Sequence, residues 1–175
     1  MEDVDEVTAT ALRARRGDEA SASQFVRATQ ADVWRLCAHL GSRAATEDLT
    51  QETYARAFAS LHRFAGRSSA RTWLLAIARR VCADAVRDAV RVRSVPADRS
   101  NSAGDPADSV TVRALLDTLP PERREAFVLT QLVGLSYAEA ADVCGCPVGT
   151  IRSRVARARA ELVEGFGRGS ARAAR

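Results

Sequence analysis

The chain has 175 residues, a formal net charge of +4 and a pI near 9.3. This length fits one ordinary domain or two small ones. All 26 basic residues are arginine, whose guanidinium groups bind phosphates and guanine edges and stay charged at any working pH. A polyanion is therefore a plausible partner. The acidic N-terminus lacks the apolar segment of a signal peptide, and no stretch is apolar enough to span a bilayer, so we expect a cytoplasmic protein without membrane contact.

The first 61 residues show helical spacing of apolar residues in three successive stretches. The first begins near Leu12, and the second ends at Gly41, a residue type common at helix ends. The third is predicted over about residues 48–61, with Phe58 on its broad apolar side. Its opposite side is polar and acidic and contains Asp48, Gln51 and Glu52. That side is either ordinary solvated surface or a docking face for a basic protein partner.

A basic, aromatic loop over residues 62–68 leads into a predicted helix over about residues 69–90. On this helix, Trp73, Arg80, Arg87 and Arg91 lie within about 40° of one another. Single-stranded DNA needs a π-surface for its unstacked bases and positive charge for its backbone. The segment therefore suits single-stranded DNA, although Trp73 taken alone is more often a core residue.

Residues 95–109 read VPADRSNSAGDPADS, a segment rich in Pro, Gly, Ser, Asn and Asp. We interpret it as a flexible acidic linker between two domains, residues 1–94 and residues 110–175. The formal charges of the three segments in chain order are +3, −2 and +3. Ordinary solvation explains this pattern, and so do two DNA-binding modules joined by a non-binding tether. Because neither block shows an alternating strand pattern, we predict an all-α fold.

The second block is predicted to form helices over about residues 110–119 and 122–133. Ser136 and Glu139 then form a capping box, which starts another short helix. This helix should end near Gly145, after which Pro147 suits the first turn of a further helix. Two helices joined by a short glycine turn predict a helix-turn-helix.

The helix after Pro147 has an apolar side and a basic side. Its predicted apolar seam, within roughly 80° of arc, consists of Val148, Ile151, Val155, Ala158 and Leu162. Opposite the seam, Arg152, Ser153 and Arg157 suit base edges in the major groove, while Arg154 and Arg159 at its margins suit phosphates. A merely solvated basic face is the alternative. We expect a flexible tail from about residue 167.

The residue inventory limits the chemistry of the chain. Cys144 and Cys146 are spaced too tightly for the usual zinc knuckle, and His39 and His62 lie far away in sequence. We therefore expect no metal and no cofactor. The sequence has no lysine for a Walker motif, no HExxH motif and no plausible Ser-His-Asp set, so we expect a binding protein rather than an enzyme.

Three segments in this order closely resemble the extracytoplasmic-function (ECF) sigma factors of the sigma-70 family, with a particular likeness to the actinobacterial SigC-type members. The segments are DLTQETYARAF from Asp48, FAGRSSARTWLLAIARR from Phe64, and SYAEAADVCGCPVGTIRSRVARARAEL from Ser136. The resemblance covers nearly the whole chain apart from the acidic start and the tail. It implies a promoter-specificity subunit of bacterial RNA polymerase, with domain σ2 before the linker and domain σ4 after it.

The resemblance also implies partners and site residues. Domain σ2 would dock on the coiled coil of the polymerase β′ subunit, and σ4 on the β flap. The docking residues implied on σ2 are Asp48, Leu49, Gln51 and Glu52. In σ2, the residues implied to open the −10 element and hold its non-template single strand are Arg63, Phe64, Arg67, Ser68, Ser69, Arg71, Trp73 and Arg80. In σ4, the implied contacts to duplex −35 DNA are base contacts from Arg152, Ser153 and Arg157 and backbone contacts from Thr150, Arg154 and Arg159.

Other functions and modes of control stay open at this point. A stand-alone helix-turn-helix regulator would bind an operator without polymerase, but the polar face at Asp48 and the loop before Trp73 would then have no purpose. A purely structural adaptor is a further alternative. The resemblance implies an anti-sigma factor, or packing of the two domains over their DNA-binding faces, as the means of keeping the chain inactive.

Overall fold

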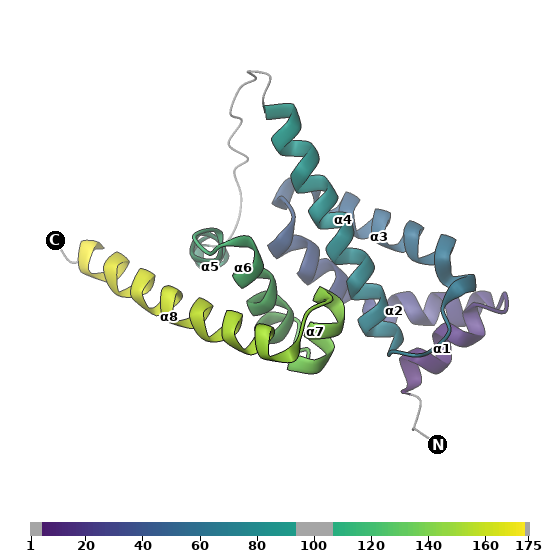
Figure 1. The fold of residues 1–175 in the computed structure, drawn as a ribbon. Helices are drawn as coiled ribbons and strands as arrows, with labels where there is room; N and C mark the ends of the chain where they lie inside the picture. The colour runs from purple at the N-terminus through teal and green to yellow at the C-terminus, as the bar shows by residue number, and fades with distance from the viewer. Residues whose placement is uncertain (1–4, 94–106, 174–175) are drawn as a thin grey trace. The chain divides into compact units, whose positions relative to one another are not determined.

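The computed structural model describes residues 5–93 and 107–173. Over these two ranges the chain forms eight α-helices, two short 3-10 helices and one π-helical turn, and no β-strand (Figure 1). The helices divide into two compact units, Met1–Val95 and Pro96–Arg175. The predicted all-α fold is confirmed. None of the described helices is long and apolar enough to cross a membrane.

The first unit is a bundle of four helices. Its elements are α1 (Glu6–Ala14), α2 (Glu19–Leu40), α3 (Thr46–Ser60) and α4 (Ala70–Arg93). Helices α2, α3 and α4 pack against one another, and α1 packs on α2 and α4. Phe25, Leu36 and Leu74 are among the largest fully buried side chains. Asp5 and Asp18 accept hydrogen bonds from backbone amides in the first turns of α1 and α2, and so cap these helices.

Helices α2 and α3 approach closely at two points. A Cβ atom placed on Gly41 would lie 2.3 Å from Leu49 Cδ1 and 2.9 Å from the Cys37 carbonyl oxygen, so an added side chain would force its neighbours to shift. Further along, the Tyr54 hydroxyl lies 2.8 Å from Thr29 Oγ1 in a buried hydrogen bond. Burial raises the pKa of Tyr54 to about 12. These contacts fix the register of α3, and therefore the direction in which its polar side points.

The apolar side predicted for α3 is wrong at Phe58, whose side chain is 40% exposed. The buried stripe of α3 runs through Leu49, Thr53 and Ala57. Phe58 lies beyond the edge of that stripe, with its ring centroid 6.4 Å from that of Tyr54. The helical periodicity correctly predicts α3, but the apolar side that it predicts is broader than the side that is buried.

The second unit contains the helix-turn-helix. Its elements are α5 (Ala107–Asp117), α6 (Pro121–Phe127), a π-helical turn (Val128–Leu132), α7 (Tyr137–Cys144) and α8 (Val148–Ala173). The capping box is present, because the Glu139 amide donates to Ser136 Oγ and the Ser136 amide donates to the Glu139 carboxylate. Gly145 ends α7 with φ of +64°, a conformation that favours glycine.

Two boundaries differ from those expected from sequence. Residues 95–106 of the expected linker lie outside the described residues, and 107–109 form the first turn of α5. The helix expected over 122–133 loses α-helical geometry at Val128, where the Val133 amide donates to the Val128 carbonyl at 2.9 Å. The backbone of α8 is helical through Ala173, and a flexible tail from about residue 167 stays a prediction.

The seam predicted for α8 is buried at Ile151, Val155 and Ala158. It is wrong at Val148, which is 39% exposed. Val148 is the first residue of α8, and helical side chains lean toward the N-terminus, so this one points past the packed part of the helix pair. Leu162 is half-buried near the other end.

Candidate nucleic-acid interface

Helix α8 presents an exposed polar face opposite its buried seam. Arg152, Ser153 and Arg157 are exposed on that face, where the sequence placed them. Ile151 and Val155, each 0% exposed, fasten the same stretch of helix to the rest of the unit. Because the backbone is held by packing on one side, the side chains on the other side project from a fixed surface. This arrangement suits reading of base edges in a major groove.

The residues at the margins of that face are bound to their own unit. Arg154 is half-buried, and its guanidinium lies 3.9 Å from Cys146 Sγ. Arg159 Nη2 donates to Gln131 Oε1 at 2.7 Å. Thr150 is half-buried, and its carbonyl accepts a hydrogen bond from the Ser153 hydroxyl at 3.0 Å. These groups are held close to the domain surface, as groups that meet a phosphate backbone would be.

In the first unit, an aromatic pair lies where the loop after α3 meets α4. Phe64 is only 4% exposed, and its ring centroid lies 4.9 Å from that of Trp73 at an interplanar angle of 37°. Trp73 is half-buried. The structure therefore places Phe64 behind Trp73 rather than on the surface, and leaves part of the indole accessible.

The polar candidates of this segment differ in whether internal bonds already hold them. Ser69 Oγ accepts from the Thr72 amide at 3.1 Å, and so caps the start of α4. Arg71 Nε donates to Asp32 Oδ2 on α2 at 2.7 Å. The remaining polar candidates have exposed side chains: Arg63, Arg67, Ser68 and Arg80. Of these, Arg63 Nε contacts the neighbouring His62 Nε2 at 3.1 Å.

The polar face of α3 combines exposed and buried members of the predicted docking set. Asp48, Gln51 and Glu52 are exposed, whereas Leu49 is 7% exposed and packs toward Gly41. The structure therefore makes three of these residues available to a partner and uses Leu49 to hold the helix in place.

An ion-pair network that sequence reasoning missed ties this face to α4. Arg56 donates to Glu52 Oε1 at 2.7 Å and to Asp84 Oδ2 at 2.8 Å, and Arg87 pairs with the same Asp84. The hydrogen bond from Arg56 lowers the pKa of Asp84, and the bond to Asp84 raises the pKa of Arg56. The spacing of Glu52 and Arg56 was a visible helical signal. The contact with Asp84 depends on the packing of two helices.

Known proteins match both units. The model "Sigma-70 region 2" matches residues 25–92, and the model "Sigma-70, region 4" matches residues 109–162. The chain is 51% identical over 172 residues to the ECF RNA polymerase sigma factor SigC of Mycobacterium tuberculosis, covering 92% of this chain and 91% of that protein. The chain belongs to the sigma-70 family. Hereafter the first unit is called σ2 and the second σ4.

One further relative and two solved structures agree with this assignment. SigE of Mycolicibacterium smegmatis, also an ECF RNA polymerase sigma factor, is 37% identical over 178 residues, which cover 93% of this chain and 69% of that protein. CnrH, solved in complex with the cytosolic domain of CnrY, has a TM-score of 0.78 at 26% identity, covering 93% of this chain and 98% of its own. The sigma factor RpoE from Bartonella quintana, solved with the anti-sigma factor NepR, has a TM-score of 0.74 at 32% identity and covers 81% and 94%. This chain is an ECF RNA polymerase sigma factor, as its three motifs indicated.

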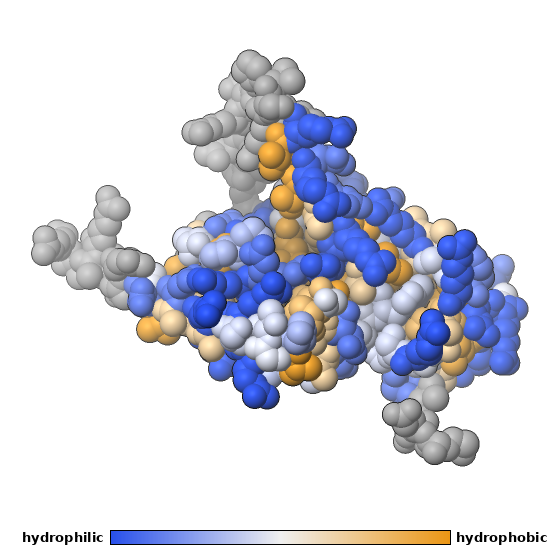
Figure 2. Space-filling view, in the orientation of Figure 1, coloured by the Kyte–Doolittle hydropathy of each residue, from blue (hydrophilic) through white to orange (hydrophobic). Residues whose placement is uncertain are grey.

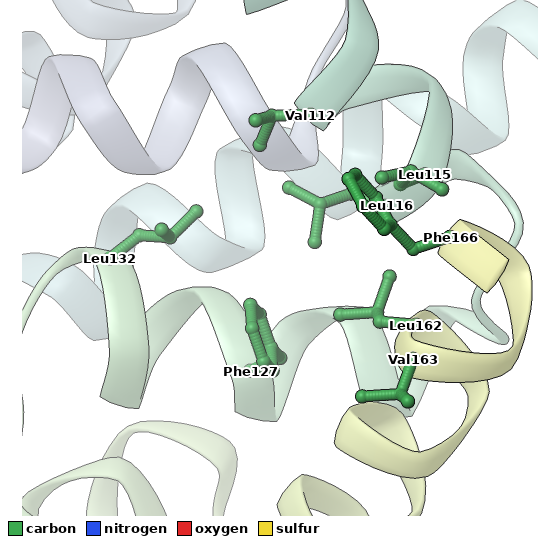
Figure 3. Close-up of a pocket in the computed structure, with 8 residues that line it drawn as sticks. All are labelled: Val112, Leu115, Leu116, Phe127, Leu132, Leu162, Val163 and Phe166. Carbon is green, nitrogen blue, oxygen red and sulfur yellow. The ribbon is translucent and has the colours of Figure 1, made fainter. Parts of the chain in front are cut away.

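Domain σ4 also contains an apolar groove that the sequence did not reveal (Figure 3). Its volume is about 430 Å³, and its lining residues are Val112, Leu115, Leu116, Phe127, Leu132, Leu162, Val163 and Phe166. Val163 and Phe166 are 73% and 64% exposed, which is unusual for large apolar side chains. The lining comes from α5, from α6 with its π-helical turn, and from α8. No single stretch of sequence carries enough of it to be recognised.

Other surface features of the sigma factor are less specific. Figure 2 shows apolar residues near the C-terminal end of α4 within a largely polar surface, where Val86 and Val90 are exposed. Cys144 Sγ lies 3.6 Å from Glu125 Oε2. Across the described ranges, no cluster of three or more His, Cys, Asp and Glu side chains has the arrangement of a metal site.

Proposed function

We propose that this chain directs promoter-specific transcription initiation by binding core RNA polymerase, reading the −35 element through σ4 and holding the melted −10 element through σ2. One observation carries the proposal. Two separate helical units each present exposed arginines, on α8 and around the start of α4, and σ2 adds an acidic polar face on α3. The work is done by binding energy rather than by catalysis, in the cytoplasm where DNA and polymerase are found.

In σ4, the exposed face of α8 enters the major groove at −35. Arg152, Ser153 and Arg157 contact base edges, since they project away from the buried seam. Backbone contacts come from Thr150, Arg154 and Arg159. The bonds of Arg154 and Arg159 to their own domain hold their guanidinium groups near the phosphate walls, where they set the position of the helix.

In σ2, the eight candidates divide into contact and support roles for the −10 strand. Arg63, Arg67, Ser68 and Arg80 are exposed and contact the strand, while Trp73 offers the π-surface for a base. Phe64 supports Trp73 from behind, and Ser69 and Arg71 fix the first turn of α4. Unpairing costs a few kcal/mol per flipped base, and stacking returns about 1 to 3 kcal/mol per captured base.

Two surfaces dock on polymerase. Asp48, Gln51 and Glu52 contact the coiled coil of the β′ subunit, and the buried Leu49 packs toward Gly41 and holds α3 in place. The apolar groove of σ4 takes the β flap, because a groove lined by three helical elements suits an amphipathic helix of a partner. An anti-sigma factor is a further class of partner, supported by RpoE, which was solved with one.

Run-off transcription with purified core polymerase on fragmented genomic DNA tests the proposal. Initiation should require both the chain and core, and the start sites should define −35 and −10 elements. The double variant Asp48→Asn, Glu52→Gln should lose affinity for core, whereas Asp88→Asn, an exposed charge on α4, serves as the control. Tight operator binding by the free chain, with no dependence on core, would favour the stand-alone regulator instead.

A further inference from the structure

We propose that α1 positions the segment that holds the −10 strand, with Thr8 and Arg15 as positioning residues. This segment, residues 61–69, is called the −10 loop here. The inference rests on the proposed role of that loop in −10 recognition. Helix α1 lies before the segment matched by the region 2 model, and no motif in the sequence pointed to it. Figure 1 shows the loop passing α1 on its way to α4.

The first tie lies near the start of the loop. Arg15, directly after α1, donates from Nη1 to the carbonyl oxygen of Phe64 at 2.7 Å, across 49 positions of sequence. The ring of Phe64 packs against Trp73. Arg15 therefore fixes the loop backbone at Phe64, the residue whose ring supports the π-surface of Trp73.

The second tie lies at the end of the loop. The Ala70 amide, the first of α4, donates to Thr8 Oγ1 at 2.8 Å in a buried hydrogen bond. The first amides of a helix have no partner within the helix, so a side chain that accepts from one sets where the helix begins. Thr8 is itself held, because its hydroxyl donates to Asp5 Oδ2 at 2.6 Å.

A third contact lies between these two. Gly66 has φ of +70°, and a Cβ atom placed there would lie 3.6 Å from Leu12 Cδ1. Thr8, Leu12 and Arg15 are spaced by four and three positions, and therefore lie on one face of α1. A single helical face thus touches the beginning, middle and end of the −10 loop.

These contacts predict that the −10 loop is ordered before it binds DNA and that this order raises its affinity for the strand. Arg67 and Ser68 lie between the two hydrogen-bonded ties, with exposed side chains. A loop whose ends are already fixed loses less conformational freedom when it binds a strand, so more of the contact energy remains as affinity. Thr8 and Arg15 act on DNA through the loop. They are not proposed to touch it.

The test compares Arg15→Ala with Arg16→Ala in the complete holoenzyme. Both variants lose one charge, but only Arg15 bonds the loop. The probe is a promoter from the run-off experiment with a single-stranded non-template −10 extension, next to the same probe with a scrambled −10 sequence. Arg15→Ala should reduce preference for the matched extension by about tenfold, and Arg16→Ala should retain it. Core binding and affinity for duplex −35 DNA should not change in either variant.

The outcomes separate the inference from the proposed function. Equal losses in Arg15→Ala and Arg16→Ala would show a plain charge effect and overturn the role of α1. If Arg15→Ala, Arg67→Ala and Trp73→Ala all leave the −10 preference unchanged, the proposed role of the loop fails instead. Should Arg15→Ala not fold, Thr8→Val and Thr8→Ser give the same comparison. The serine retains the acceptor for the Ala70 amide and should preserve the −10 preference that the valine loses, and equal preference in both would overturn the inference.

Discussion

Replacing Arg152 with alanine is the sharpest test of how σ4 reads DNA. The side chain is exposed, and the neighbouring Ile151 and Val155 keep α8 packed, so truncation should leave the fold unchanged. The loss is then that of one base contact, about 1 to 3 kcal/mol, or roughly 5- to 150-fold in affinity. It should be confined to one base pair of the −35 element, because a single side chain reaches a single position.

Arg154→Ala provides the contrast within the same helix. Arg154 is half-buried and its guanidinium lies near Cys146, at the margin assigned to the DNA backbone. Its loss should weaken binding to all −35 sequences by a similar factor. It should also reduce the slope of log affinity against log salt by about 0.9, since one phosphate contact is removed.

The assay measures holoenzyme affinity for a set of −35 duplexes that differ by single base pairs, at several salt concentrations. Arg152→Ala should remove discrimination at one position and retain it elsewhere. A uniform loss across all duplexes would assign Arg152 to the backbone, and no loss would remove Arg152 from the −35 contact. Either result refutes the reasoning from the exposed face.

Three further predictions concern stability. Gly41→Ala should destabilise σ2 by about 1 to 3 kcal/mol in urea unfolding, because the added Cβ meets Leu49. At Gly149 an added Cβ has open space, so Gly149→Ala should cost no stability, and equal effects of the two substitutions would contradict this reasoning. Ser136→Ala should cost σ4 about 1 kcal/mol in thermal unfolding by removing the acceptor for the Glu139 amide, and Ser136→Thr should restore most of it. Because burial raises the pKa of Tyr54 to about 12, the unfolded chain loses the phenol proton first as pH rises above 10, and the free energy of unfolding of σ2 should fall between pH 10 and about 12. The chain has no lysine to titrate there, and Tyr54→Phe should flatten the slope; an unchanged slope would contradict the assignment.

Most of the helices could be predicted because their signals are local. The capping box at Ser136 and the turn at Gly145 need only a few neighbouring residues, and both are present in the structure. Exposure at Phe58 and Val148 could not be predicted in the same way. Periodicity shows which residues share a side of a helix, but the width and length of the buried part depend on where the neighbouring helix ends.

The candidate sites were predicted as residue types, and the structure adds how those residues are bonded. Ser69 was singled out as a polar contact, yet its hydroxyl already caps α4. The groove of σ4 and the support from α1 were not predicted at all, because each depends on residues that meet only after folding. A tie between Arg15 and Phe64 leaves no pattern in a sequence read by local spacing.

The arginines of the two proposed DNA-binding surfaces fall into two physical groups. Arg71 is half-buried and donates to Asp32 Oδ2 at 2.7 Å, and Arg154 is half-buried beside Cys146 Sγ, whereas Arg152 and Arg67 are exposed. A held guanidinium has already lost its rotamer freedom on folding, so it can fix position at little further entropic cost. An exposed guanidinium must be ordered when it binds its partner, and the entropic cost of that ordering is offset only when the hydrogen bonds formed have favourable geometry. The exposed arginines should therefore discriminate between sequences, and the held ones should set the register in which they do so.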